Sequence, residues 1–174
     1  QITKLNKPMK IDIVILLLAA LVPLAVGNIW YNPKIGFGNA WLKASDMTEE
    51  KAKGANMIVI LGLTYLFSFF VAFALCSLSI HQVSLTSLFF LQPIDDPSTE
   101  MGALYKSVMD VLGNSYRTFK HGAFHGTIAG IVIALPVISV GAMFERRGFK
   151  YIAIHAGYWI VSMALMGGIV CAYA

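Results

Sequence analysis

The sequence predicts an all-α integral membrane protein: a four-helix transmembrane bundle with an interfacial amphipathic helix between spans two and three. Of its 174 residues, 57% are hydrophobic and only 13% are charged. A water-soluble domain of this composition would expose too much apolar surface. The apolar residues also fall into four runs of the length that crosses a bilayer about 30 Å thick. We therefore expect residues 1–174 to form a single transmembrane domain.

The first span is expected at about residues 11–30. Asp12 stands at its start, where the helix dipole favours a carboxylate. Pro23 removes a backbone donor and predicts a kink in the span. Because the run lacks a small-residue cleavage site after a short apolar core, we expect it to be retained rather than removed as a signal peptide.

The second span is expected at about residues 56–79, in a helix that begins near Met47, where hydroxyl and carboxyl side chains favour a helix start. His81 lies at the far end of this span. The apolar run 83–91 is too short to cross the membrane, so it either prolongs the second helix or lies along the membrane surface.

The region 92–120 is the longest one without a predicted span. Met101, Leu104, Tyr105 and Val108 recur at helical spacing and give one apolar stripe. About thirty residues cannot build a core of their own. We therefore expect an amphipathic helix at about residues 99–113 that rests on the membrane surface.

The third and fourth spans are expected at about residues 122–144 and 151–173, and both carry small residues that let helix backbones approach closely. The third has glycines at four-residue spacing, and the fourth offers a matching surface. We expect these glycines to pack within the chain, although a partner's helix is an alternative. They are Gly122, Gly126, Gly130, Gly157, Gly167 and Gly168.

Four spans place the amino terminus, the region 92–120 and the carboxyl terminus at one membrane face, side A. The segment 28–41 and the turn at Arg146 and Arg147 lie at the other, side B. Lysine and arginine do not orient the protein, because they divide six to seven between the faces. Side A has Lys4, Lys7, Lys10, Lys106, Arg117 and Lys120; side B has Lys34, Lys43, Lys51, Lys53, Arg146, Arg147 and Lys150.

Side B gathers most of the large aromatic residues of the loops and helix ends. They form either an aromatic belt at the membrane surface or a platform that binds a lipid headgroup, a small anion or a partner's loop. In the platform, Trp41 should contact His155 or Trp159. The platform residues are Trp30, Tyr31, Phe37, Trp41, Arg146, Arg147, His155, Tyr158 and Trp159.

Three histidines belong to side A and are the candidates for a metal or haem site. His121 and His125 are one helical turn apart and face the same way, while His81 comes from the second helix. His155 lies at side B, so a four-histidine site is excluded. Because no carboxylate or cysteine offers a fourth ligand, we expect no bound metal and no cofactor.

The sequence contains no constellation typical of catalysis. It has no nucleophile beside a base, no phosphate-binding loop and no dinucleotide-binding fingerprint after a strand. The basic residues are scattered, which argues against nucleic acid as a partner. Cys76 and Cys171 lie inside apolar runs and are expected to be packing residues. We therefore expect a protein that is not an enzyme.

One pattern is similar to that of a known family. Gly27-x-x-Trp30-Tyr31-x-Pro33, then Phe37-Gly38-x-x-Trp41, together with the later Ala156-Gly157-Tyr158-Trp159, resembles the bacterial membrane family catalogued as domain of unknown function 1761. The resemblance covers most of the chain and implies a four-helix membrane protein. It implies no activity and no catalytic residue.

Three hypotheses for function follow. The first is an accessory or assembly subunit that docks other membrane proteins or lipid, and the nearly apolar centre of each span favours it. The second is a protein that binds or transports a small molecule, and the third is a metal or haem membrane protein using the side A histidines. The expected partners are the lipid bilayer and other membrane protein subunits, and the expected location is the bacterial cytoplasmic membrane.

Overall fold

The computed structural model describes residues 11–48, 50–51 and 54–174, and in these ranges it contains helices and no strand. Four helical stretches are long and apolar enough to cross a membrane: Ile13–Trp30, Met57–Ser79, Phe119–Phe144 and Phe149–Tyr173. The all-α class with four candidate spans is confirmed. Four of the lysines counted above, Lys4, Lys7, Lys10 and Lys53, lie outside the described residues.

The first span consists of two helices, α1 (Ile13–Ala19) and α2 (Val22–Trp30), joined by a single turn. The Asp12 side chain accepts a hydrogen bond from the Val14 amide at 2.8 Å and so begins α1. Pro23 stands in the first turn of α2, where its missing N–H costs nothing. The short helix α3 (Gly38–Ala44) begins within the side B segment 28–41 and continues beyond it.

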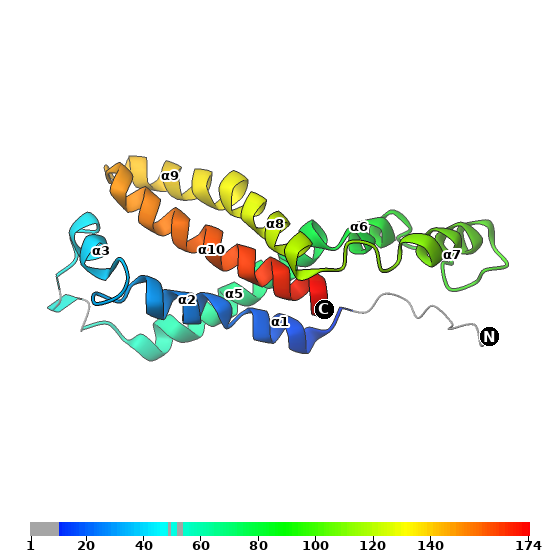
Figure 1. Cartoon of the computed structure of the whole chain (residues 1–174), viewed down its shortest axis with the longest axis horizontal. Helices are drawn as coiled ribbons and strands as arrows, with labels where there is room; N and C mark the ends of the chain where they lie inside the picture. Colours follow the sequence, from blue (N-terminus) through cyan, green and yellow to red (C-terminus); the bar gives the residue numbers. More distant parts are fainter. Residues whose placement is uncertain (1–10, 49, 52–53) are drawn as a thin grey trace.

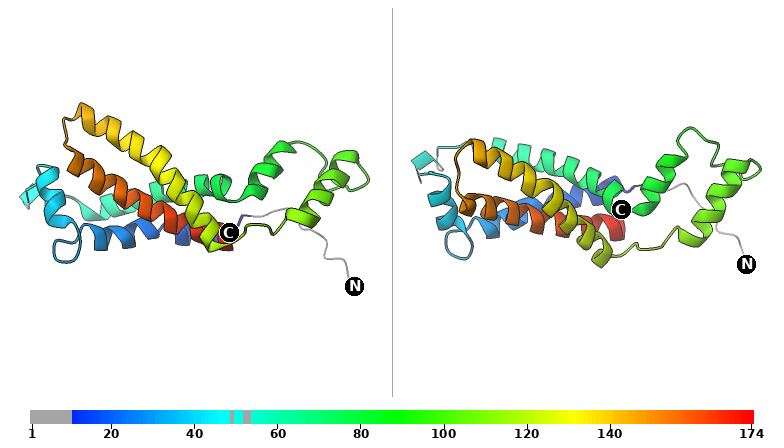
Figure 2. Two further views of the ribbon diagram at one scale, coloured as in Figure 1. Left: turned by 45° about the horizontal axis from the view of Figure 1, so that its top comes forward. Right: turned by 90° about the horizontal axis from the view of Figure 1, so that it is seen from above.

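The second span is α5 (Met57–Ser79), which begins at Asn56, whose side chain accepts from the Val59 amide. The helix breaks at Ile80, and α6 (His81–Leu88) continues in a new direction. The region 92–120 contains α7 (Glu100–Leu112), begun by Thr99. Helices α6 and α7 lie beyond the end of the bundle (Figures 1 and 2), and a membrane-surface position for α7 stays a prediction.

The third span is continuous but not uniform. It runs as α8 (Phe119–Ala129), a π-helical turn (Gly130–Ala134) and α9 (Leu135–Phe144). Pro136 lies in the first turn of α9 and cannot donate a backbone hydrogen bond, and a π turn accommodates such a gap. The fourth span, α10 (Phe149–Tyr173), is a single unbroken helix.

Helix α10 is the centre of the bundle. In its most apolar stretch 56% of the residues are buried, compared with 17–22% in the other three spans. Buried residues of α1 and α5, such as Leu16 and Leu75, pack with Met166 and Val170 of α10 in one core cluster. The remaining faces of α1, α5 and α9 are covered with exposed leucine, isoleucine, valine and phenylalanine, as expected of helices in lipid.

Glycines of α8 and α10 bring these two helices into backbone contact. A Cβ atom on Gly122 would lie 2.1 Å from the Gly167 carbonyl oxygen, and one on Gly126 would lie 2.0 Å from that of Met163. Gly130 faces Ile160 in the same way. Such contacts leave no room for a side chain, so the stripe of α8 packs inside the chain.

The two ends of the bundle differ in content (Figure 1). The start of α1, the carboxyl terminus, α6 and α7 lie toward one end, which corresponds to side A. Helix α3 and the turn between α9 and α10 lie at the other, which corresponds to side B.

Candidate functional site

The segment 28–41 at side B, here called the aromatic segment, folds back onto the end of α2. The Phe37 amide donates to the Trp30 carbonyl at 2.6 Å. A Cβ atom on Gly36 would lie 2.2 Å from the Ile29 carbonyl oxygen, and one on Gly38 would lie 2.4 Å from that of Tyr31. Two glycines are therefore needed for this tight turn.

Trp30 joins this segment to α10. Its indole Nε1 donates to the Ile154 carbonyl at 3.0 Å. Its ring lies against Gly157, where an added Cβ would be 3.0 Å from the indole. The centroids of the Trp30 and Phe37 rings are 4.8 Å apart. The position of Gly157 thus provides the flat surface that the indole occupies.

Tyr31 connects the rings of the platform. Its hydroxyl is hydrogen-bonded to His155 Nδ1 at 3.2 Å. The centroid of its ring lies 5.6 Å from that of Trp41 and 5.2 Å from that of Tyr158. We expected Trp41 to contact His155 or Trp159 directly; the ring contact seen for Trp41 is with Tyr31, which in turn contacts His155.

Two of the predicted platform residues, Trp159 and Arg146, have further contacts that the sequence did not indicate. Trp159 packs against the core cluster while its ring lies 5.2 Å from that of Tyr158. Arg146 is exposed, and its backbone amide donates to the Met143 carbonyl at 3.0 Å. Tyr158 is buried, and its hydroxyl donates to the Pro23 carbonyl at 3.0 Å, so that it joins α10 to the break in the first span.

Arg147 forms ion pairs with acidic side chains at the outer edge of the platform. Its guanidinium pairs with the Asp46 carboxylate at 2.5 Å and with Glu145 at 3.7 Å, and it lies 5.7 Å from the centre of the Tyr151 ring. These interactions tie the loop after α3 to the start of α10. They also engage the Arg147 guanidinium.

A groove of about 340 Å³ lies between the aromatic segment and the first turns of α10. Its walls are almost wholly apolar, so Lys150 contributes its aliphatic stem. The other lining residues are Trp30, Phe37, Ala40, Ala153, Ile154 and Gly157. The sequence identified Lys150 only as a cation beside a span, and it did not identify Ala40 or Ala153. Small residues at a helix start carry no signal that separates a groove wall from ordinary packing.

Tyr31 is a protonated hydrogen-bonding group of the platform. Burial raises the pKa of the Tyr31 phenol far above its ordinary value of 10.0, and the neighbouring Tyr158 and Tyr151 phenols raise it further. The Tyr31 phenol therefore stays protonated at neutral pH and serves as a hydrogen-bonding group. Within the part of the chain that the structure describes, no nucleophile with an activating base lines the groove.

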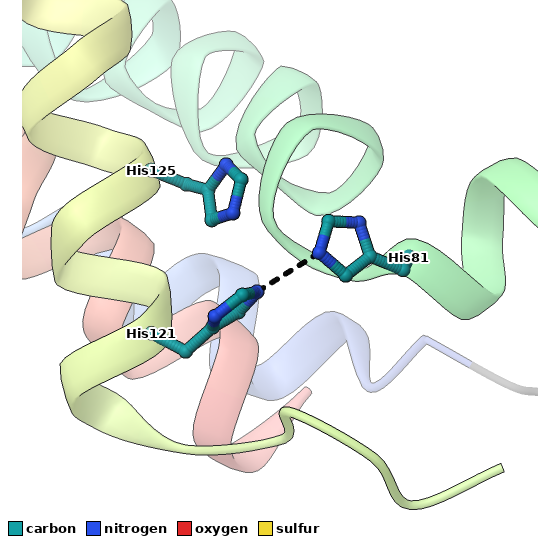
Figure 3. Close-up of side chains that lie close together, drawn as sticks. All are labelled: His81, His121 and His125. Carbon is teal, nitrogen blue, oxygen red and sulfur yellow. Dashed lines mark hydrogen bonds between the residues drawn. The ribbon is translucent and has the colours of Figure 1, made fainter. Parts of the chain in front are cut away.

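The side A histidines form a second group, here called the histidine cluster (Figure 3). His121 and His125 project from α8 toward His81, the first residue of α6. The Nε2 atoms of His81 and His121 are 3.0 Å apart, and the three rings offer nitrogen atoms that all lie within 4.8 Å of one another. Only the pair on α8 could be placed together from the sequence.

Gln82 is a residue that sequence reasoning missed. Its side chain is buried, and its amide nitrogen donates to the Leu112 and Ser115 carbonyls at 2.6 and 2.9 Å. These bonds hold the start of α6 against the segment that leads into α8. An amide beside a histidine at a helix break was the available signal.

Comparison with known proteins places the chain in a family. The family model described as "Protein of unknown function (DUF1761)" matches residues 14–171, nearly the whole chain. Comparisons with curated proteins and with solved structures gave no match. The match spans the platform, the glycine stripe and the histidine cluster. The chain, with its four candidate spans, therefore belongs to the DUF1761 family of proteins of unknown function.

Proposed function

We propose that this protein is a non-enzymatic accessory membrane protein that holds an anionic phospholipid on its side B platform. The single observation that carries the proposal is the apolar groove whose wall includes the side-chain stem of Lys150, an exposed cation. An acyl chain fits apolar walls at the membrane surface, and a lipid phosphate fits a cation at the same level. The proposed location, the bacterial cytoplasmic membrane, rests on the family resemblance.

The start of α10 supports an anion beside Lys150. No side chain caps this helix, and the amide groups of Phe149 and Lys150 donate to no backbone carbonyl among the described residues. A 25-residue helix has a partial positive charge at its first turn. A lipid phosphate would satisfy these amides while its acyl chain lies against Trp30 and Phe37.

Fluorescence quenching by brominated lipids tests the proposal, because Trp30 lines the groove. With Trp41 and Trp159 replaced by Phe, Trp30 is the sole tryptophan. In nanodiscs with a small fraction of brominated lipid, brominated phosphatidylglycerol should quench Trp30 more strongly than brominated phosphatidylcholine. One lysine near the membrane surface contributes about 1 kcal/mol, so Lys150→Gln should reduce the preference about fivefold.

Lys34→Gln is the matched control, because Lys34 is an exposed lysine of the side B segment 28–41 and does not line the groove. It should keep the preference, whereas Ala153→Phe, which fills the groove, should reduce quenching by both lipids. Equal quenching by both lipids in the parent protein would leave an aromatic belt as the better account. A membrane protein that co-purifies with the parent and is lost in Ala153→Phe would assign the groove to a protein partner.

A further inference from the structure

Three imidazole rings converge where α5 and α6 meet α8 (Figure 3). The closest pair of ring nitrogens, in His81 and His121, is 3.0 Å apart, and the ligand atoms of the three residues lie within 4.8 Å of one another. Two nitrogens bound to one tetrahedral zinc ion at 2.0–2.1 Å are about 3.3 Å apart. Small side-chain rotations would bring all three to that separation.

Helix α8 presents two of the three rings from a rigid support. Gly122 and Gly126, which follow His121 and His125 in the sequence, are the residues at which α8 touches the backbone of α10. The Thr118 side chain accepts from the His121 amide and begins the helix. The close α8–α10 contact therefore sets the direction in which both imidazoles project.

His81 is held equally well by its neighbours. Ile80 is buried in the core cluster, and Gln82 is buried and bonded to the Leu112 and Ser115 carbonyls. The histidine itself is exposed, since it lies at the break between α5 and α6. The ring is thus accessible to an ion from solvent while its backbone is anchored on both sides.

The surroundings of the cluster suit a bound cation with open coordination positions. The Tyr116 ring stacks on His121 at 5.2 Å, and the Phe124 ring meets His125 edge-on at 5.7 Å. Neutral imidazoles suit zinc, copper, nickel and iron, whereas magnesium and calcium need oxygen ligands. Three histidines with water in the fourth position form a complete zinc site.

We infer that His81, His121 and His125 bind one divalent late-transition metal ion, with Zn²⁺ as the reference ion. The sequence led us to expect no metal, because it shows no fourth protein ligand; an open three-histidine site does not require one. This site is at the opposite end of the bundle from the lipid groove and is independent of the proposed function.

The ion would also link α6 to α8. The segment that contains α6 and α7 begins at His81, the first residue of α6, and ends before His121. In the described structure the hydrogen bonds from Gln82 to the Leu112 and Ser115 carbonyls join the two ends of this segment. A metal ion bound across the cluster ties α6 to α8 directly. The position of the α6–α7 extension relative to the bundle is therefore set by metal binding as well as by Gln82.

Metal content and affinity test the inference on the full chain, purified in detergent without a histidine tag. After chelator treatment and reloading with Zn²⁺, the protein should hold one equivalent through gel filtration, and Co²⁺ should give the visible spectrum of a low-coordinate nitrogen site. Loss of an outer-shell partner already weakens metal binding 10–100-fold. We therefore expect each of His81→Ala, His121→Ala and His125→Ala to weaken Zn²⁺ binding at least about 100-fold.

Lys120→Gln is the control, because Lys120 is exposed beside His121 and is not in the cluster; it should keep one equivalent. A second measurement needs no variant: Zn²⁺ should protect His121 and His125 of the parent protein from acylation by diethyl pyrocarbonate. Failure of the reloaded parent protein to retain Zn²⁺ would overturn the inference. Retention of Zn²⁺ by the His121→Ala/His125→Ala double variant, or equal acylation with and without Zn²⁺, would overturn it too.

Discussion

Substituting Gly126 by alanine tests the contact between α8 and α10. A Cβ atom at this position would lie 2.0 Å from the Met163 carbonyl oxygen and 2.7 Å from its carbon, both of which are backbone atoms. Because no side chain can rotate away, the two helices must separate. Gly141, in the second half of the same span, is the matched control: a Cβ there would meet nothing within 4 Å.

The expected magnitudes follow from two opposing effects. Replacing a helical glycine by alanine stabilises a helix by about 1 kcal/mol at either position. Overpacking costs about 1–3 kcal/mol, and at Gly126 the obstructing atoms belong to the backbone, which places the cost at the upper end. We therefore expect Gly126→Ala to lose about 1–2 kcal/mol and Gly126→Leu more, whereas Gly141→Ala should be neutral or stabilising.

Unfolding of the isolated protein in mixed micelles with increasing sodium dodecyl sulfate, followed by circular dichroism, measures the differences. The order of stability should be Gly141→Ala, then the parent protein, then Gly126→Ala, then Gly126→Leu. If Gly126→Ala is as stable as Gly141→Ala, the two backbones do not meet at Gly126. Unchanged stability with loss of a co-purifying protein would indicate that the stripe docks a partner instead.

Three further predictions concern the platform. Tyr158→Phe removes the hydrogen bond to the Pro23 carbonyl and should cost about 0.5–1.5 kcal/mol in the same unfolding measurement, with Tyr173→Phe, which is exposed, as the neutral control. Because the raised pKa of Tyr31 keeps the folded state protonated while the unfolded chain ionises near pH 10, stability should fall as pH rises above about 10, and less so in Tyr31→Phe. Arg147→Ala should cost less than about 1 kcal/mol, because the Asp46 side chain is 85% exposed; a larger loss would mean that the pair is shielded from solvent.

Much of the fold could be predicted from local sequence. The four spans follow from runs of apolar residues, and the break in the first span follows from Pro23, whose missing N–H favours a helix start. Likewise, the glycines around Phe37 indicate a tight turn. The start of the third span was harder to predict. Thr118 begins α8 at Phe119, before the apolar run that we took as the start of the span.

The sequence could not assign faces to the helices, and the candidate sites depend on those faces. Amphipathic periodicity identifies the buried side of a helix in water, but a span that is apolar all round has no such period. For this reason the sequence did not indicate that Trp159 packs against the core cluster, or that the ring of Trp41 lies against that of Tyr31.

The sequence by itself determined that the protein is a bundle of four apolar helices, and that His121 and His125 share a helix face, since both follow from length and spacing along one element. The tertiary structure decided that His81 completes a cluster with them and that Lys150 stands beside an apolar groove. These juxtapositions join residues far apart in the chain. They depend on how each helix is rotated about its axis, and that rotation is set by backbone contacts such as the one at Gly126.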